Sequence, residues 1–308
     1  MNYPKVSIII LNWNGLQDTI ECLESLKKIS YPNYKVIVVD NYSEGDDVKT
    51  LSGKFKDYIH VIENDRNYGF AEGNNIGIRY ALNQGVDYVL LLNNDTVVHP
   101  DFLTELVKEV LKGREIGIAG SKMYYHSRPD EVCVTGNFIN YWTGDLFSIK
   151  RRGSDTAHVE YAIEVDWVSG CCMLISRDVL LNVGLLDNSY SLYYEDPDIC
   201  IRAARKGYKS LFVPSSKIWH KISTRLAFRN RNPSFYGFYA YSLVRNRFLL
   251  MQKHWSKPQF ITSSICYIAS WPKLFVEYLI YYRNCQMLMG FIRGIIASIK
   301  RNTPYKTI

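Results

Sequence analysis

Short apolar runs recur along the first 120 residues at the spacing of strands in a parallel sheet. The runs are Val6–Leu11, Val36–Val39, Ile59–Ile62, Tyr88–Leu92 and Ile116–Ala119. Continuous apolar runs without alternating polar positions are typical of strands buried on both faces of a sheet. Apolar residues at helical spacing fill intervals between them, at Ile20–Leu26, Ala71–Leu82 and Phe102–Leu111. This alternation predicts βαβ units and an α/β fold with a mostly parallel sheet.

Polar segments follow each of the first four predicted strands. They begin at Asn12, Asp40, Glu63 and Asn93, and they are rich in Asn, Asp or Gly. Because ligands of open α/β sheets bind at the carboxyl ends of the strands, these segments predict a nucleotide site. Alternatively, the same residue types simply form the turns between strands and helices.

The pattern loosens between Tyr124 and about residue 161, where glycines and the basic run Lys150–Arg152 occur. We expect a long excursion there, with a mobile loop over the site. Regular order returns at Val165–Ser176.

Four acidic or imidazole residues are candidates for chemistry. Asp95 directly follows a predicted strand, where a carboxylate suits a divalent cation that bridges the phosphates of a nucleotide diphosphate. Its alternative role is a helix N-cap. Glu195 and Asp196 follow two tyrosines, and adjacent carboxylates in such surroundings suit general base catalysis, although acids also favour a first helical turn. His220 could bind a metal or act as an acid–base group, but a lone histidine is more often structural.

Charge divides the chain unequally. Residues 1–216 carry 22 Lys and Arg against 29 Asp and Glu, whereas residues 217–308 carry 15 basic residues, 18 aromatic residues and one acid, Glu277. The longest uncharged window of this tail, Pro258–Pro272, is shorter than the ~20 apolar residues of a spanning helix. We expect Tyr236–Trp255 to form an amphipathic helix and the tail to lie in the interface of an anionic membrane. Alternatively, the tail forms a solvated basic face together with a helical core or a contact with a second copy of the chain. The acidic first part and the aliphatic tail argue against nucleic-acid binding.

The seven cysteines include no CxxC pair, which argues against a disulfide framework or a zinc knuckle. No signal-peptide pattern follows Met1, so we expect a cytoplasmic protein that lies peripherally at the inner face of the cell membrane.

Six motifs together resemble family 2 glycosyltransferases. They are VSIIILNWNG, VVDNYS, NYGFAEGNN, LLLNNDT, VSGCCMLISR and YYEDPDICIRAARKGY, followed by His220. The resemblance covers roughly residues 5–255 and is closest to the rhamnosyltransferase-like and galactofuranosyltransferase-like branch. It implies a GT-A fold, with a Rossmann-like, mostly parallel sheet flanked by helices. It also implies a nucleotide-diphosphate sugar donor, Mg²⁺ or Mn²⁺, inversion at the anomeric carbon and a glycan or lipid-linked acceptor in surface polysaccharide synthesis.

The resemblance assigns roles position by position. Asp95 and His220 would bind the metal, since Asn93 replaces the first acid of the family's DXD motif. Asp196 would be the catalytic base, and Glu195 its positioning neighbour. Trp167 and Gly170 match an acceptor-side strand, with Trp167 stacking on a sugar or belonging to the core. The donor-binding positions would be Asn12, Asn14, Asp40, Asn67, Gly69, Asn74 and Asn94, with Asp40 accepting a hydrogen bond from N3–H of uracil or thymine.

We therefore expect a catalytic domain over residues 1–225 and a basic, aromatic-rich helical region over residues 226–308. Within the first, residues 1–120 would bind the nucleotide sugar and residues 121–225 the acceptor. The donor would be dTDP-rhamnose or a UDP-sugar. A dinucleotide-dependent oxidoreductase is disfavoured, because Asn12-Trp13-Asn14-Gly15 is not a GxGxxG turn. A catalytically inactive sugar-nucleotide-binding or scaffold protein stays open, because of Asn93.

Overall fold

The structure, a computed structural model, describes residues 3–148, 159–190, 192–221, 233–281 and 284–300. The chain divides into two compact units. The sheet unit comprises residues 1–138, 148–188 and 195–222, and the helical unit comprises residues 139–147, 189–194 and 223–308. One boundary near residue 225 is predicted from the sequence, whereas residues 139–147 and 189–194, which precede it, belong to the helical unit.

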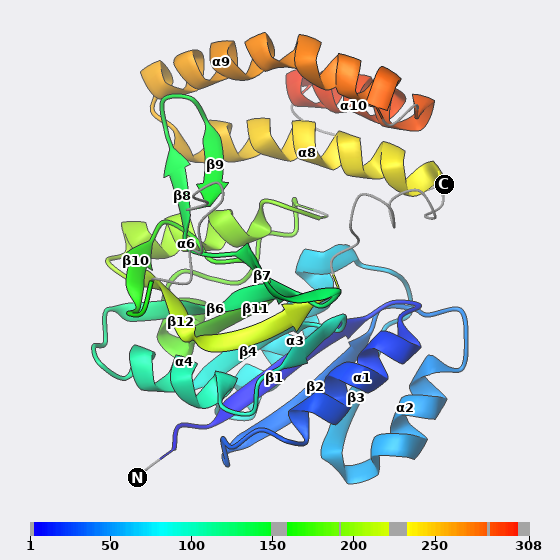
Figure 1. Cartoon of the computed structure of the whole chain (residues 1–308), viewed down its shortest axis with the longest axis vertical. Coiled ribbons are helices and arrows are strands. Elements are labelled where there is room, and N and C mark those ends of the chain that lie inside the picture. Colours follow the sequence, from blue (N-terminus) through cyan, green and yellow to red (C-terminus); the bar gives the residue numbers. More distant parts are fainter. Residues whose placement is uncertain (1–2, 149–158, 191, 222–232, 282–283, 301–308) are drawn as a thin grey trace. The chain divides into compact units, whose positions relative to one another are not determined.

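The sheet unit is built on one large mixed sheet (Figure 1). Its strands are β1 (Val6–Asn12), β2 (Tyr34–Asp40), β3 (Ile59–Glu63), β4 (Tyr88–Asn93), β5 (Thr96–Val98), β6 (Ile116–Tyr125), β7 (Arg128–Val134), β10 (Ile163–Val165), β11 (Cys172–Ser176) and β12 (Lys209–His220). The order is β10-β12-β6-β11-β4-β1-β2-β3, with β5 paired to β12 and β7 to β6. The α/β prediction is confirmed.

One reversed strand determines which residues share an edge of this sheet. β3, β2, β1 and β4 are parallel, and β12 is parallel to β6. β11 lies between β4 and β6 and is antiparallel to both. The start of β11 therefore lies at the same edge as the carboxyl ends of β1, β2, β4, β6 and β12.

Helices cover both faces of the sheet. They are α1 (Leu16–Leu26), α2 (Asp47–Phe55) with the 3₁₀ turn η1 (Lys56–Tyr58), α3 (Gly69–Asn83), α4 (Phe102–Val110), α5 (Arg177–Asn182) and α6 (Glu195–Arg205). Ile8 and Ile10 of β1 pack in a core with residues of α1, α2 and α4. Ile9, on the opposite face of the same strand, packs with residues of α3, α5 and α6. Two cores explain why the strand sequences are apolar throughout.

The loosely patterned stretch after Tyr124 is more regular than expected. It contains β7 and a two-stranded sheet of β8 (Asn137–Asn140) and β9 (Asp145–Ser148). Gly144, with φ +71°, lies in the turn between the latter two strands, where a left-handed residue is required. The loop predicted around Lys150–Arg152 lies outside the described residues.

The helical unit contains α8 (Pro233–His254), α9 (Lys257–Val276), the π-helical turn η3 (Glu277–Tyr281) and α10 (Cys285–Lys300). Ser256 and Gln259 form a capping box at the start of α9. α8 and α10 pack so closely that a Cβ added at Gly290 would lie 2.0 Å from the carbonyl oxygen of Gly237. Among the described residues, we find no helix whose length and apolar character would let it cross a bilayer.

The amphipathic character predicted for Tyr236–Trp255 is wrong. α8 buries Tyr236, Tyr241 and Leu250 as well as the polar Ser242 and Asn246, so both kinds of residue point inward. The sequence pattern misled because several neighbours enclose this helix, and its aromatic residues are core residues.

Candidate active site

The turn after β1 is organised by Asn12, which is completely buried. The side-chain carbonyl oxygen of Asn12 accepts hydrogen bonds from the Thr19 hydroxyl at 2.7 Å and from the Asn94 side-chain amide at 3.4 Å. Its amide nitrogen lies 2.7 Å from a carboxylate oxygen of Asp40 and 2.9 Å from one of Asp47. Asn12 therefore holds together the ends of β1, β2 and β4 through its side chain, which is closed to solvent.

Ser43 joins the turns after β1 and β2, and sequence reasoning missed it. Its hydroxyl donates to Asp40 at 2.7 Å and accepts from the backbone N–H of Asn14 at 2.9 Å. Asp40 is 1% exposed and also accepts from the backbone N–H of Ser43 at 2.9 Å. Asn14 has φ +51° and accepts from the N–H of Glu44. Asp40 and Asn14 thus shape a double turn.

The other donor-side positions lie at the start of α3. Asn67 accepts hydrogen bonds from Asn41 and from the N–H of Gly69, both at 2.8 Å. Gly69 has φ +77°, a conformation that favours glycine. Asn74 is buried and donates to the carbonyl of Phe70 at 2.9 Å. These contacts tie α3 to the end of β2.

Asp95 and His220 meet at the carboxyl edge of the sheet. β5 pairs with the end of β12, so that Thr96 lies opposite His220. Asp95, which precedes Thr96 in the chain, therefore lies close to His220. The Asp95 Oδ1 and His220 Nε2 atoms are 2.8 Å apart. Although burial alone would lower the pKa of His220, nearby Cys171 and Asp95 raise it well above its usual value.

Lys221, directly after His220, connects this pair to α1. Its backbone N–H donates to the carbonyl of Asp95 at 2.9 Å. Its ammonium group forms ion pairs with Asp18, at 2.7 Å, and Glu21. Lys221 thereby anchors both Asp95 and His220 to a helix, a role that the sequence did not signal.

Glu195 and Asp196 begin α6 after two tyrosines with left-handed backbones, Tyr193 at φ +67° and Tyr194 at φ +76°. Such conformations are costly outside glycine and mark a constrained turn. Burial, and then the neighbouring Asp196, raise the pKa of Glu195 well above its usual value. Burial also raises the pKa of Asp196 to about 7. Glu195 is 5% exposed, and its Oε2 atom has no hydrogen-bond partner among the described residues.

Gly170 and Cys171 connect the acidic pair to the Asp95–His220 pair. The N–H of Gly170 donates to Asp196 at 3.2 Å. The Sγ atom of Cys171 is 4.0 Å from Nε2 of His220 and 3.2 Å from the amide nitrogen of Asn93. The structure therefore brings Asp95, Asp196 and His220 to one edge of the sheet. The position of Cys171 follows from the reversed β11, which sequence periodicity did not reveal.

Trp167 and Gly170 do not belong to a strand, contrary to expectation. They lie in the connection from β10 to β11, where Trp167 forms an isolated bridge with Asn137. The N–H of Cys172 donates to the carbonyl of Ser169, which closes a turn instead of extending a ladder. Trp167 is half-buried against the second core, and its indole N–H has no partner among the described residues.

Asp95 and His220 fit a divalent cation. Carboxylate oxygen and imidazole nitrogen are suitable ligands, and their 2.8 Å separation suits two ligands at about 2.0–2.1 Å from one ion. The described residues contain no group of three or more His, Cys, Asp or Glu side chains that could hold a metal. Asp95 and His220 therefore suit an ion that takes its remaining ligands from a substrate and water, as Mg²⁺ does with phosphates.

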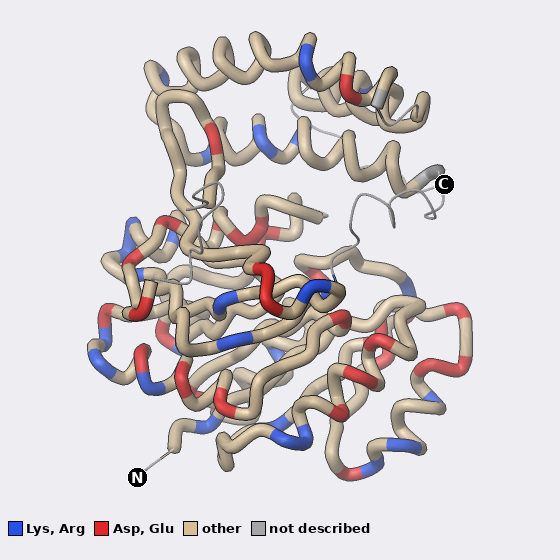
Figure 2. Tube along the Cα trace, viewed as in Figure 1, with Lys and Arg blue, Asp and Glu red and all other residues tan. Residues whose placement is uncertain are grey.

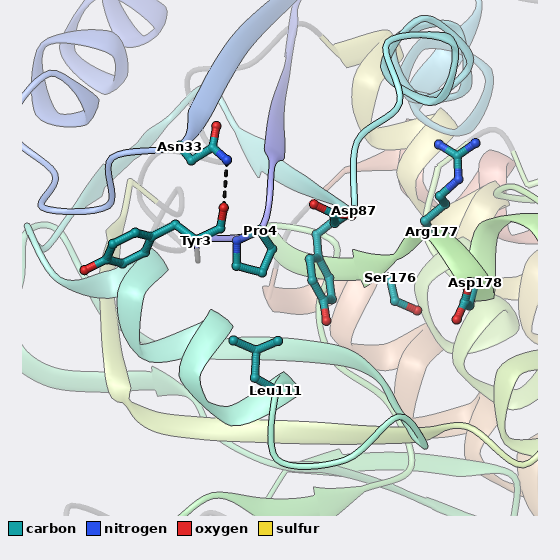
Figure 3. A pocket seen from close by; sticks show the side chains of 9 residues that line it. Tyr3, Pro4, Asn33, Asp87, Leu111, Ser176, Arg177 and Asp178 are labelled. Atoms are coloured by element: carbon teal, nitrogen blue, oxygen red, sulfur yellow. Dashed lines mark hydrogen bonds between the residues drawn. The ribbon is translucent and has the colours of Figure 1, made fainter. Parts of the chain in front are cut away.

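A pocket of about 430 Å³ lies at the opposite edge of the sheet (Figure 3). It is lined by residues before β1, β2 and β4 and after β11, including Asn33, Asp87 and Arg177. Asp87 accepts the N–H of Lys5, and Arg177 donates to the carbonyls of Leu82 and Val86. These charged groups serve the fold, and the pocket is remote from the candidate site.

The fold is that of the GT-A glycosyltransferases. The solved structure of the mannosyltransferase PcManGT from Pyrobaculum calidifontis, in complex with GDP-Man and Mn²⁺, superposes with a TM-score of 0.61 at 15% identity, covering 98% of this chain and 89% of that chain. Residues 4–233 match the family model described as "Glycosyltransferase like family 2", and the chain belongs to this family. The predicted resemblance and the GT-A fold are confirmed.

Two relatives show how far the similarity extends. The low-salt glycan biosynthesis hexosyltransferase Agl10 of Haloferax volcanii is 26% identical over 97% of this chain and 92% of its own length. The dTDP-rhamnosyl transferase RfbF of Shigella flexneri is 26% identical over 80% of this chain and 79% of its own length.

Proposed function

We propose that the protein is an inverting, metal-dependent glycosyltransferase of surface polysaccharide synthesis. It transfers a sugar from a nucleotide-diphosphate donor, dTDP-rhamnose or a UDP-sugar, to a hydroxyl of a glycan or lipid-linked acceptor. The observation that carries this proposal is the proximity of two chemically different groups. Asp196 contacts Gly170, and the adjacent Cys171 lies beside His220, which contacts Asp95.

Asp95 and His220 would hold Mg²⁺ or Mn²⁺. When bound, the ion neutralises charge that develops on the diphosphate leaving group. Asp196 takes the proton of the acceptor hydroxyl, and a pKa of about 7 makes it a stronger base than an ordinary aspartate. Burial and Asp196 favour the protonated form of Glu195, so the pair need not carry two charges.

The transfer is one displacement. The acceptor oxygen forms its bond to the anomeric carbon while the bond from that carbon to the diphosphate oxygen breaks. The proton passes to Asp196, and the electron pair leaves with the nucleoside diphosphate. Attack opposite the leaving group inverts the anomeric carbon.

On the donor side, the turn after β1 and the start of α3 would bind the nucleotide and sugar. Asn12 acts through Asp40 and Asn94, because its own side chain is buried. Asp40 is 1% exposed, so its Oδ1 atom, which accepts one hydrogen bond from Ser43, would accept the N3–H of uracil or thymine once the double turn opens on donor binding. RfbF is a dTDP-rhamnosyl transferase by name, which supports a thymidine donor. On the acceptor side, Gly170 and Trp167 would border the acceptor.

Transfer would take place at the inner face of the cell membrane, where the enzyme is peripheral. Residues 217–308, with 15 basic residues and one acid, support attraction to anionic lipids. A lipid-linked acceptor would be available at this surface. This location can be tested by asking whether the expressed enzyme co-fractionates with membranes and whether salt or detergent releases it.

Release of nucleoside diphosphate in the presence of acceptor tests the reaction. Asp196→Asn should lower transfer by about 10²–10⁴-fold with donor binding retained, because only the proton acceptor is removed. Asp101→Asn, at an exposed acid, is the matched control and should transfer normally. Near-normal transfer by Asp196→Asn with unchanged donor binding would refute the assignment of the base.

An inactive sugar-nucleotide-binding or scaffold protein is the second candidate, because Asn93 stands where the family motif has an acid. It predicts donor binding without any release of nucleoside diphosphate. Screening UDP-, dTDP- and GDP-sugars by thermal shift with Mn²⁺ selects the donor for both measurements.

A further inference from the structure

Helices α9 and α10 and the turn η3 each carry two apolar faces. One face lies in the core of the helical unit, with Tyr267, Tyr278, Met287 and Phe291 buried. The other is exposed, and we call it the apolar stripe. It consists of Ile261, Ile265, Ile268, Phe275, Val276, Leu279, Ile280, Met289, Ile292, Ile296 and Ile299.

The spacing of these residues makes the stripe a continuous face of each helix. Ile261, Ile265 and Ile268 recur at intervals of four and three in α9. Met289, Ile292, Ile296 and Ile299 recur at intervals of three, four and three in α10. Intervals of three and four place side chains on one side of a helix.

The stripe is too large to be incidental. Its residues are between 41% and 76% exposed. At roughly 150–200 Å² for a fully exposed large side chain, these fractions leave on the order of 1,000 Å² of apolar surface summed over α9, η3 and α10, arranged in rows along the helices and not as scattered single residues. Such a surface requires a partner.

Charge distinguishes between the partners that could cover it. Lys257, Lys273 and Arg293 are exposed on the same two helices and form no ion pair among the described residues. Glu277 is the only acid among residues 217–308. Figure 2 shows the distribution of Lys and Arg and of Asp and Glu along the chain. A second copy docked through the same stripe would bring like charges together, whereas anionic lipid headgroups would neutralise them.

We propose that the apolar stripe docks into the headgroup layer of an anionic membrane, with α9 and α10 lying in the plane of the interface. Isoleucine and phenylalanine side chains enter the acyl boundary, and Lys257, Lys273 and Arg293 contact lipid phosphates. Membrane docking would hold the enzyme near a lipid-linked acceptor, and only this consequence rests on the proposed function. It narrows the membrane contact from residues 226–308, where the sequence placed it, to α9 and α10.

Vesicle flotation of the full chain tests the proposal. The double variant Ile265→Ser/Ile296→Ser removes two central residues of the stripe. The control Leu111→Ser/Leu181→Ser removes two apolar residues of the sheet unit that are 57% and 58% exposed, against 63% and 47% in the stripe. The vesicles are pure phosphatidylcholine and phosphatidylcholine mixed with phosphatidylglycerol.

The wild type and the control should bind anionic vesicles, and the stripe variant should bind at least about tenfold more weakly. Lys273→Glu/Arg293→Glu should weaken binding to anionic vesicles only. Equal binding of the stripe variant and the wild type would overturn the proposal. So would a wild-type dimer that the stripe variant converts to a monomer, because the stripe would then be a subunit contact. Transfer to a soluble acceptor should be unchanged in the stripe variant. The transfer assay therefore tests the proposed reaction, and vesicle flotation separately tests the membrane contact.

Discussion

Replacing Asp196 by asparagine should stabilise the fold at neutral and alkaline pH while it impairs transfer. Burial raises the pKa of Asp196 from 3.8 to about 7. Between these values the folded chain binds more protons at this position than the unfolded chain does. Stability is therefore fully present below about pH 4 and is lost as the pH rises through 7. The asparagine side chain of the variant would not titrate, so the variant escapes this loss.

The magnitude follows from the size of the shift. One pKa unit corresponds to about 1.4 kcal/mol, so a rise to about 7 gives at most about 4 kcal/mol. Asp196 is only half-buried, and water that reaches its carboxylate reduces the effect. Loss of the hydrogen bond from Gly170 reduces it further. We expect the variant to be more stable than the wild type by about 1–3 kcal/mol at pH 8, and by little at pH 4.

Denaturant unfolding from pH 4 to pH 8, with metal removed by chelator, measures this difference. Asp198→Asn is the matched control, because Asp198 lies two residues away in the same helix but is paired with Arg202 at 2.7 Å. Breaking that buried ion pair should destabilise the fold by about 3–5 kcal/mol. The reasoning fails if both variants change stability in the same direction, or if the effect of Asp196→Asn is independent of pH.

Three further predictions concern the rate, the metal and the helical unit. Transfer by the wild type should rise about tenfold per pH unit below pH 7 and level off above it, because only ionised Asp196 accepts a proton; a kcat/KM profile checks this. Lys221→Met should weaken Mn²⁺ binding by about tenfold or more and Lys221→Arg should largely restore it, as measured by titration, because the clamp on α1 positions His220. Gly290→Val should destabilise the helical unit by several kcal/mol in thermal unfolding, because its Cβ would overlap Gly237. Gly53→Ala, which meets nothing within 4 Å, should change stability by less than about 1 kcal/mol.

Strands β1 to β4 and the start of β6 were predictable from the sequence, because burial on two faces of a sheet gives a continuous apolar run. Val6–Leu11 is such a run, since Ile8 and Ile9 face different cores. Short strands were not predictable. β8 and β9 contain few apolar residues, and they are defined by their pairing and by Gly144, not by a periodic pattern.

α8 was misjudged for a related reason. Mixed aromatic, aliphatic and basic residues are compatible with an interfacial helix and with a helix enclosed by neighbours. Only tertiary packing separates the two, and it buries Tyr236, Asn246 and Leu250 together. The exposed stripe of α9 and α10, by contrast, has helical periodicity in the sequence, but its core face has the same periodicity, so the sequence alone could not say which was covered.

The candidate site shows the same division between residue type and placement. The residue types and positions of Asp95 and Asp196 made them candidates for chemistry, and the family resemblance added His220, but their meeting depends on sheet order. β11 runs against β4 and β6, and its first turn therefore reaches the edge where β4 and β12 end. That reversal places Gly170 against Asp196 and Cys171 between His220 and Asn93. The two-residue segment of Gly170 and Cys171 thus joins Asp196 to the Asp95–His220 pair, which is the proximity on which the proposed reaction depends.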